Sequence, residues 1–176
     1  MIDARQVSEE VLFTTQALTT VTRNDIELLK ERAQLTRRKR MRLCAHPNTA
    51  ARVHEMLIVL PKGAYVRPHE HVNKDESFHL IEGTVTVIVF GHDQSVQEVI
   101  PMGTVVSGKP FYYRMPGGIY HTFLIESEVV VFHETTTGPF KKADMVLAAW
   151  APEEEDEPAA ARFMAGLQET AGRSVR

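Results

Sequence analysis

The middle of the chain is a series of short runs rich in apolar and β-branched residues, separated by turn residues. Between residues 54 and 134 the runs are HEMLIVL, the stretch 65–72, SFHLIEG, TVTVIVF, VQEVIPM, FYYRM, IYHTFLI and EVVVFHE. Gly, Pro, Asn or Asp lies between most neighbours, a pattern typical of β-strands joined by tight turns. About eight strands within roughly a hundred residues favour a closed barrel or jelly roll over an open sheet.

Helical spacing is confined to the two ends. Ile26, Leu29 and Ala33 recur near helical spacing behind Asn24, the expected N-cap, and predict one short N-terminal helix. Towards the other end, the acidic stretch PEEEDEP predicts a solvated linker, and the residues after it predict a short C-terminal helix with one apolar face. The expected divisions are a helical extension at 1–36, the barrel at 37–152, and the acidic linker with its helix at 153–176.

Composition narrows the class of protein. The 176 residues suffice for one sizeable core, and the formal charge of -3 argues against a nucleic-acid partner. No apolar run approaches the roughly 20 residues of a membrane helix, so we expect no membrane partner. The single cysteine, Cys44, can form neither an intrachain disulfide nor a multi-thiolate metal site, which fits the reducing cytoplasm.

The densest chemical signal is the stretch GAYVRPHEHVNKDESFHLIEG at 63–83. His69 and His71 are two residues apart, so on a strand their side chains point to the same face. A turn follows them, and the next strand can return Glu76 to the same interior. His121 begins a later strand after the tight turn PGG and supplies a third imidazole. This set predicts a site for one divalent transition metal, either tetrahedral zinc or octahedral iron, manganese, nickel or cobalt.

These residues resemble the motifs of the cupin superfamily, G-x5-H-x-H-x3-4-E-x6-G and G-x5-P-x-G-x2-H-x3-N. The first motif is matched in full from Gly63 to Gly83, and the second is matched at its proline, its later glycine and His121. Pro110 and Ile125 replace the first glycine and the asparagine of the second motif. The resemblance implies an all-β cupin jelly roll with short helices at both ends and a metal held by the four predicted ligands.

The wider stretches RLCAHPN, VRPHEHVNKDESFH, FYYR, YHT and VVFHETTTGPF resemble the WbuC-type cupin-fold metalloproteins, over about residues 37–152. Relatives of this type are encoded beside bacterial surface-polysaccharide genes. The resemblance therefore implies a carbohydrate-related substrate, and cupin barrels commonly pair, which implies a homodimer.

Several residues near the ligands are candidates for binding or chemistry. Tyr65 and Arg67 share parity with His69, so we expect them to face the interior, where Arg67 binds an anionic group or forms an ion pair at the rim. In FYYRM, either Tyr113 or Arg114 faces inward, but not both. On a late strand, one of His133 and Glu134 is the candidate partner or acid/base. The basic run at 37–42 is either a solvated connector or an attractor for an anionic sugar or nucleotide at the cavity mouth.

Two classes of function remain open at this stage. The first is an enzyme that acts on a small polar or anionic sugar-related molecule, either a metal-dependent isomerase or epimerase, or an iron-dependent dioxygenase. The second is a non-catalytic cupin that binds a small molecule through its metal. The position of His133 or Glu134 relative to the metal ligands discriminates between them.

Overall fold

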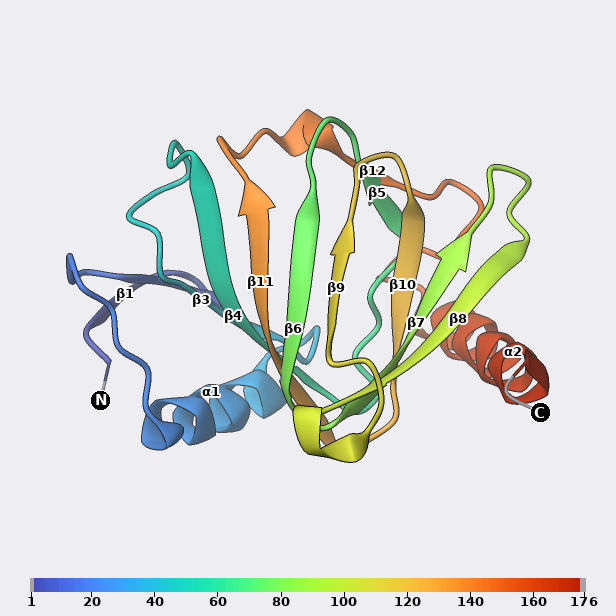
Figure 1. Ribbon diagram of the computed structural model, residues 1–176, viewed down its shortest axis with the longest axis horizontal. Coiled ribbons are helices and arrows are strands. Elements are labelled where there is room, and N and C mark those ends of the chain that lie inside the picture. The colour runs from blue at the N-terminus through green and yellow to red at the C-terminus, as the bar shows by residue number, and fades with distance from the viewer. Residues whose placement is uncertain (1, 175–176) are drawn as a thin grey trace.

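The computed structural model describes residues 2–174, which fold into two facing β-sheets with one helix near each end (Figure 1). The helices are α1 (Arg23–Leu35) and α2 (Glu157–Ser174), with short 3₁₀ turns at Val105–Ser107 and Lys142–Asp144. The strands are β1 (Ala4–Ser8), β2 (Val11–Thr14), β3 (Met41–Cys44), β4 (Val53–Pro61), β5 (His69–His71), β6 (Glu76–Glu82), β7 (Thr84–Phe90), β8 (Val96–Gly103), β9 (Tyr112–Met115), β10 (Tyr120–Ile125), β11 (Val129–Thr137) and β12 (Met145–Leu147).

Strands distant in sequence lie side by side in both sheets. The larger sheet has the order β1-β2-β3-β4-β11-β6-β9, and the smaller has the order β12-β5-β10-β7-β8. All pairings are antiparallel except that of β2 with β3. This is the jelly-roll arrangement that the sequence predicts, and the predicted all-β fold with two terminal helices is confirmed.

The main core fills the space between the sheets. Phe78 and Phe132 of the larger sheet stack with ring centroids 4.2 Å apart, and Phe123 of the smaller sheet packs against both. Apolar residues on the inner faces of both sheets surround these rings. Burying aromatic surface of this kind is a major driving force for folding.

The N-terminal helix covers the outer face of the larger sheet. Leu29 and Ala33 pack there on residues of β3, β4 and β11. The helix begins after Thr22, whose backbone N–H donates to the Asp25 carboxylate at 2.9 Å, so the predicted cap at Asn24 is wrong. Thr22 and Asp25 form the cap because together they satisfy donors that the first turn leaves free.

Four strands were not predicted. β1, β2 and β3 extend the larger sheet, and β12 forms an edge of the smaller one. Since β2 pairs with β3, the first residues share a sheet with the barrel strands. These strands have three to five residues each, too few for a periodic pattern to show. The division at residue 36 stays a prediction.

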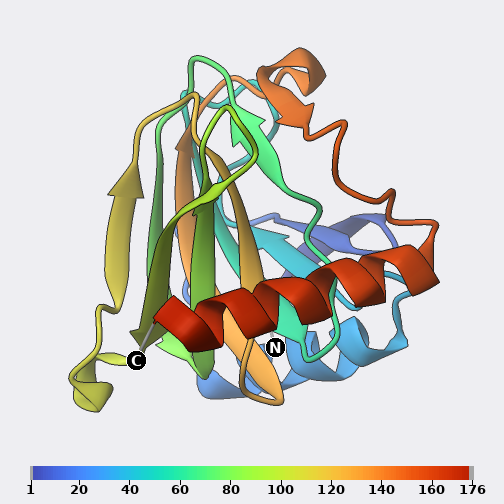
Figure 2. The same cartoon turned by 90° about the vertical axis from the view of Figure 1, so that its right-hand side faces the viewer.

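The predicted C-terminal helix is confirmed, and it packs on the outer face of the smaller sheet (Figure 2). Leu167 and Ala171 contact the apolar residues of β7 and β10 there. The acidic linker before it is not simply solvated, because Glu154 lies 2.7 Å from Arg40 and 2.9 Å from Arg38. Neither helix in residues 2–174 is long and apolar enough to cross a membrane.

Candidate metal centre

Three histidines from two neighbouring strands meet inside the sandwich. His69 and His71 lie two residues apart on β5, and β10 pairs with β5 so that His121 stands directly opposite His69. One ring nitrogen of each residue lies within 4.8 Å of the other two. The strand register thus forms a cluster that could hold a metal ion.

Backbone hydrogen bonds orient two of the rings. The Nδ1 atoms of His69 and His121 lie 3.0 Å from the carbonyl oxygens of Arg67 and Ile119, respectively. A carbonyl only accepts, so each Nδ1 carries the hydrogen and each Nε2 keeps a lone pair for a metal. Burial, reinforced by His121 and His71, lowers the pKa of His69 to about 3, so this ring is neutral at neutral pH.

Glu76 reaches the same point from the opposite sheet. Its carboxylate oxygens lie 3.2 Å from His71 Nε2 and 3.4 Å from His121 Nε2. Tyr113 donates a hydrogen bond from its hydroxyl to the same carboxylate at 2.7 Å. Burial opposes ionisation, but the neighbouring His121 and His71 hold the pKa of Glu76 well below its usual range. The same carboxylate raises the pKa of His71 despite the burial of that ring.

The donor set therefore fits a divalent transition metal. It offers three imidazoles and one ionised carboxylate, which zinc, iron, manganese, nickel and cobalt all accept. The structure brings together all four residues that the sequence predicts as ligands. Ordinary strand alternation and one tight turn account for this, because each residue lies on a regular strand.

A cavity of about 260 Å³ opens beside the cluster, with His71 in its wall. Glu134 also lines it, and Arg42, Lys74 and Lys141 give the wall positive charge. Burial and the nearby Glu76 charge raise the pKa of Glu134 to about 7. The cavity thus combines cationic side chains with two half-buried carboxyl groups, those of Glu134 and Asp144.

The structure separates the two candidates on β11. Val130 and Phe132 belong to the inner core and Val131 to the cluster under α1, so alternation puts Glu134 on the inner face and His133 on the outer one. His133 therefore lies on the opposite face of the sheet from the histidine cluster. Only Glu134 remains a candidate for acid/base chemistry.

Tyr65 and Arg67 do not face the interior, which corrects the expectation. The Tyr65 hydroxyl donates to the Pro152 carbonyl at 2.9 Å, and the Arg67 guanidinium donates to the Ala148 carbonyl at 3.0 Å. Strand alternation fails here because residues 64–68 are irregular and β5 begins only at His69. These two side chains hold the segment that leads to α2.

The expectation that only one residue of the Tyr113–Arg114 pair faces inward is met. Tyr113 stacks on Phe78, with ring centroids 5.2 Å apart, and its hydroxyl bonds Glu76. Arg114 is exposed and forms an ion pair with Asp75. Tyr113 thus contacts Glu76, one of the predicted metal ligands, whereas Arg114 lies on the outer surface of the protein.

Sequence reasoning missed two groups that line the cavity, Lys74 and His46. Lys74 lies in the turn between the ligands, yet it is buried, and its ammonium donates to the Pro139 carbonyl at 2.9 Å. His46 and His54 stack with ring centroids 4.2 Å apart. A turn lysine and an isolated histidine carry no local signal, because distant segments bring them together.

Comparisons with known proteins agree with this cupin-like fold. A family model described as a domain of unknown function (DUF6016) matches residues 21–102. The solved structure of protein SO0799 from Shewanella oneidensis superposes with a TM-score of 0.51 at 13% identity, covering 70% of this chain and 77% of that one. No curated protein matches the sequence.

Two further solved structures share less of the fold. A sugar phosphate isomerase of the cupin superfamily from Silicibacter pomeroyi gives a TM-score of 0.41 at 21% identity, over 50% of this chain and 52% of that one. Oxalate decarboxylase from Bacillus subtilis gives 0.47 at 20% identity, over 65% of this chain and 28% of that one. A shared fold does not determine a reaction. The protein has a cupin-like fold with a buried three-histidine cluster.

Proposed function

We propose that this protein is a metal-dependent enzyme that transfers a proton on a small anionic, sugar-related molecule, as an isomerase or epimerase does. The observation that carries the proposal is Glu134, a second, half-buried carboxyl group that lines the same cavity as His71 and is separate from Glu76. A non-catalytic metal site needs no such group. In our proposal His69, His71, Glu76 and His121 hold the metal.

The cavity wall supports an anionic substrate. Arg42, Lys74 and Lys141 surround it with positive charge, while Val11 and Met56 supply apolar surface. Lys74 is held by the Pro139 carbonyl and by Asp144 at 3.5 Å, so its charge is fixed in place. Fixed charges in a cavity bind an anion with little loss of entropy.

Glu134 is the group placed to accept and return a proton. A pKa near 7 leaves both its protonated and its ionised form populated at neutral pH, which suits a general acid or base. A divalent metal bound by the cluster would supply a Lewis acid that polarises a substrate carbonyl or hydroxyl oxygen. Tyr113 keeps the Glu76 carboxylate oriented towards the histidines through its hydrogen bond.

The proposal extends to the finer expectations from the sequence. The WbuC-type resemblance supports a substrate from surface-polysaccharide metabolism. The common pairing of cupin barrels supports a homodimer, and the single cysteine supports a cytoplasmic location. The two alternatives, an iron-dependent dioxygenase and a non-catalytic binding protein, would each give a different result in the experiment below.

The test is deuterium exchange followed by NMR. Protein isolated with its native metal is incubated in D₂O with a panel of sugar phosphates and sugar acids. We expect exchange at one carbon-bound hydrogen, and Glu134→Gln should slow it by about a hundredfold or more. Glu55→Gln makes the same chemical change at an exposed position of β4 and should leave the rate unchanged.

Three results would contradict the proposal. Exchange at the wild-type rate in Glu134→Gln would remove the acid/base role. Oxygen consumption with an iron-loaded protein, without exchange, would favour the dioxygenase. Saturable binding of a panel member without exchange or turnover would favour the non-catalytic alternative.

A further inference from the structure

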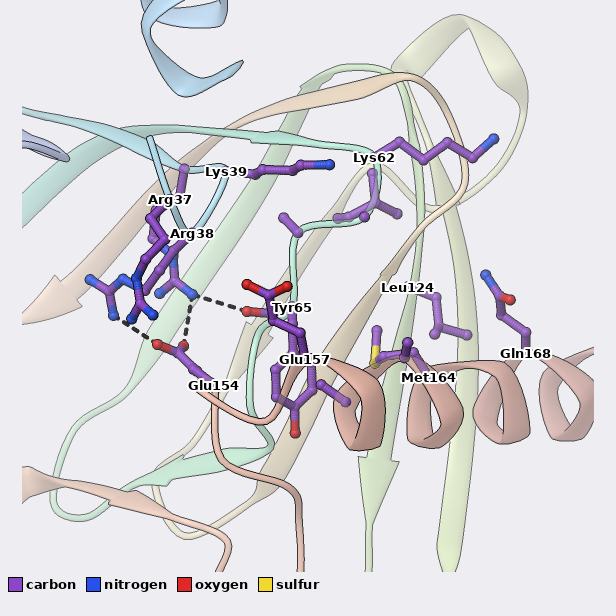
Figure 3. Close-up of a pocket in the computed structure, with 16 residues that line it drawn as sticks. Arg37, Arg38, Lys39, Lys62, Tyr65, Leu124, Glu154, Glu157, Met164 and Gln168 are labelled. Carbon is purple, nitrogen blue, oxygen red and sulfur yellow. Dashed lines mark hydrogen bonds and ion pairs between the residues drawn. The ribbon is translucent and has the colours of Figure 1, made fainter. Parts of the chain in front are cut away.

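A second cavity, of about 440 Å³, lies between the basic run, the loop after β4 and helix α2 (Figure 3). Its wall is made of Arg37–Arg40, Lys62–Tyr65, Leu124 and Ile125, together with Glu154, Glu157 and one face of α2. None of these residues lines the cavity beside the histidine cluster. The two cavities are therefore separate sites.

Positive charge dominates the second cavity. Five cationic side chains line it, against the carboxylates of Glu154 and Glu157. Arg38 and Arg40 both pair with Glu154, whose contacts are marked by dashed lines in Figure 3, and Arg38 also pairs with Glu10, so two carboxylates offset the two guanidinium charges of this triad. The triad joins the basic run to the segment that leads into α2, and the cations outside it remain for a ligand.

Three cations lie outside the triad: Arg37, which pairs with Glu155 at 3.5 Å, and the two lysines Lys39 and Lys62, which we consider for the ligand. Lys39 extends from the basic run towards the loop that carries Lys62 (Figure 3), and it has no ion pair within residues 2–174. Its backbone has φ 47, a left-handed conformation that a residue with a side chain rarely adopts. Such outliers persist where the surrounding structure enforces them, often at binding sites. Lys62 pairs only with Glu128 at 3.4 Å, and both side chains are mostly exposed, so this pair is weak.

The rest of the wall is largely apolar. Leu124 and Ile125 of β10 contribute to it, and Ala161 and Met164 of α2 stand across from them. The Tyr65 ring is fixed there because its hydroxyl donates to the Pro152 carbonyl. Methionine adapts its shape to a bound apolar group, and the aromatic ring offers a flat contact surface.

We propose that this second cavity binds a small phosphate monoester that has an apolar or aromatic body. Lys39 and Lys62 contact the phosphate, as lysine ammonium groups commonly do. The body lies against Tyr65 and Met164. The volume falls within the range of about 300–1,000 Å³ that is usual for small-molecule sites. The paired state of Glu154 keeps its charge from repelling the phosphate.

The test measures binding of phenyl phosphate by isothermal titration calorimetry, with inorganic phosphate for comparison. We expect saturable binding of one phenyl phosphate per chain, and weaker binding of inorganic phosphate, which lacks the apolar body. The double variant Lys39→Gln/Lys62→Gln should weaken phenyl phosphate binding by about tenfold or more. Ala161→Asp places a carboxylate on the exposed α2 surface of the cavity and should weaken it similarly.

Two controls keep the result specific. Lys109→Gln removes one exposed lysine that does not line this cavity and should leave the affinity unchanged. His121→Ala should also leave it unchanged, because the histidine cluster belongs to the other cavity. The proposal is overturned if no saturable binding occurs, if the double variant binds like wild type, or if His121→Ala abolishes binding.

Discussion

The two cavities differ in how their charged groups are compensated. Beside the histidines, Glu76 and Lys74 are buried and Glu134 is half-buried, and each is surrounded by groups that shift its protonation or fix its position. In the second cavity, Lys39 and Lys62 are exposed, and the partly exposed ion pairs of Glu154 attach the segment that leads into α2. Buried charges interact strongly and tolerate little change, whereas exposed charges interact weakly and respond to salt. The first region is therefore suited to chemistry and the second to reversible binding.

The largest expected effect concerns the pH dependence of stability in metal-free protein. Burial raises the pKa of Glu134 to about 7, so the folded state holds this proton more tightly than the unfolded chain. Below the ordinary carboxyl pKa both states are protonated, and Glu134 has no effect on stability. As the pH rises from there through 7, Glu134 destabilises the fold by up to about 3 kcal/mol.

Urea unfolding of chelator-treated wild type and Glu134→Gln from pH 4 to 8 measures this effect. The variant should gain stability relative to wild type as the pH rises, and the gain should level off above pH 7. Glu55→Gln removes one carboxylate at an exposed position and should show no such gain. A pH-independent difference between wild type and Glu134→Gln would mean that folding does not raise the pKa of this carboxyl group.

Next in size is the hydrogen bond that orients Glu76. Tyr113→Phe removes the hydroxyl that donates to the carboxylate at 2.7 Å and leaves the stacked ring. Metal affinity should fall by about tenfold or more, because partners of metal ligands typically contribute this much. Competition with a fluorescent chelator measures the change. The neighbouring Tyr112 is exposed, so Tyr112→Phe is the control, and equal affinities in the two variants would contradict the role of Tyr113.

A smaller effect is expected where α2 is attached. Glu154→Gln breaks the pairs with Arg38 and Arg40, which are only partly exposed, and should cost about 1 kcal/mol of unfolding free energy. Glu155→Gln breaks the pair with Arg37, in which both side chains are mostly exposed, and should cost less than about 0.5 kcal/mol. Urea titrations compare the two, and equal losses would show that the triad does not hold the helix.

The smallest effect is the salt dependence of the second cavity. Raising the ionic strength from 0.01 to 0.15 M shortens the screening length from about 30 to about 8 Å. Phenyl phosphate affinity should then fall by about threefold, and the dependence should nearly vanish in the Lys39→Gln/Lys62→Gln variant. Calorimetry at the two salt concentrations measures it, and an equal dependence in wild type and variant would place the ligand elsewhere.

The fold and the histidine cluster were accessible from sequence because their signals are local. His69, His71, Glu76 and His121 all lie on regular strands, where alternation and a tight turn decide which side chains converge. The same rule failed at Tyr65 and Arg67, because the chain before β5 is irregular and interacts with the segment near Ala148.

The second cavity was out of reach for a different reason. Its wall comes from the basic run, the loop after β4, β10 and α2, which no short pattern connects. The ion pairs of Glu154 with the basic run join residues more than a hundred positions apart. From the sequence, the basic run is either a solvated connector or an attractor for anions, and the pairing that leaves Lys39 and Lys62 for a ligand is visible only in the tertiary structure.

The most direct test of the central claim is elemental analysis of protein purified without added metal and without a metal-binding tag. The account predicts close to one equivalent of a transition metal in the wild type, and almost none in His69→Ala or His121→Ala. His92→Ala, which alters an exposed histidine in a turn, should retain the metal. Wild-type protein without metal that also fails to take up zinc, iron, manganese, nickel or cobalt would contradict the claim that the cluster is a metal centre.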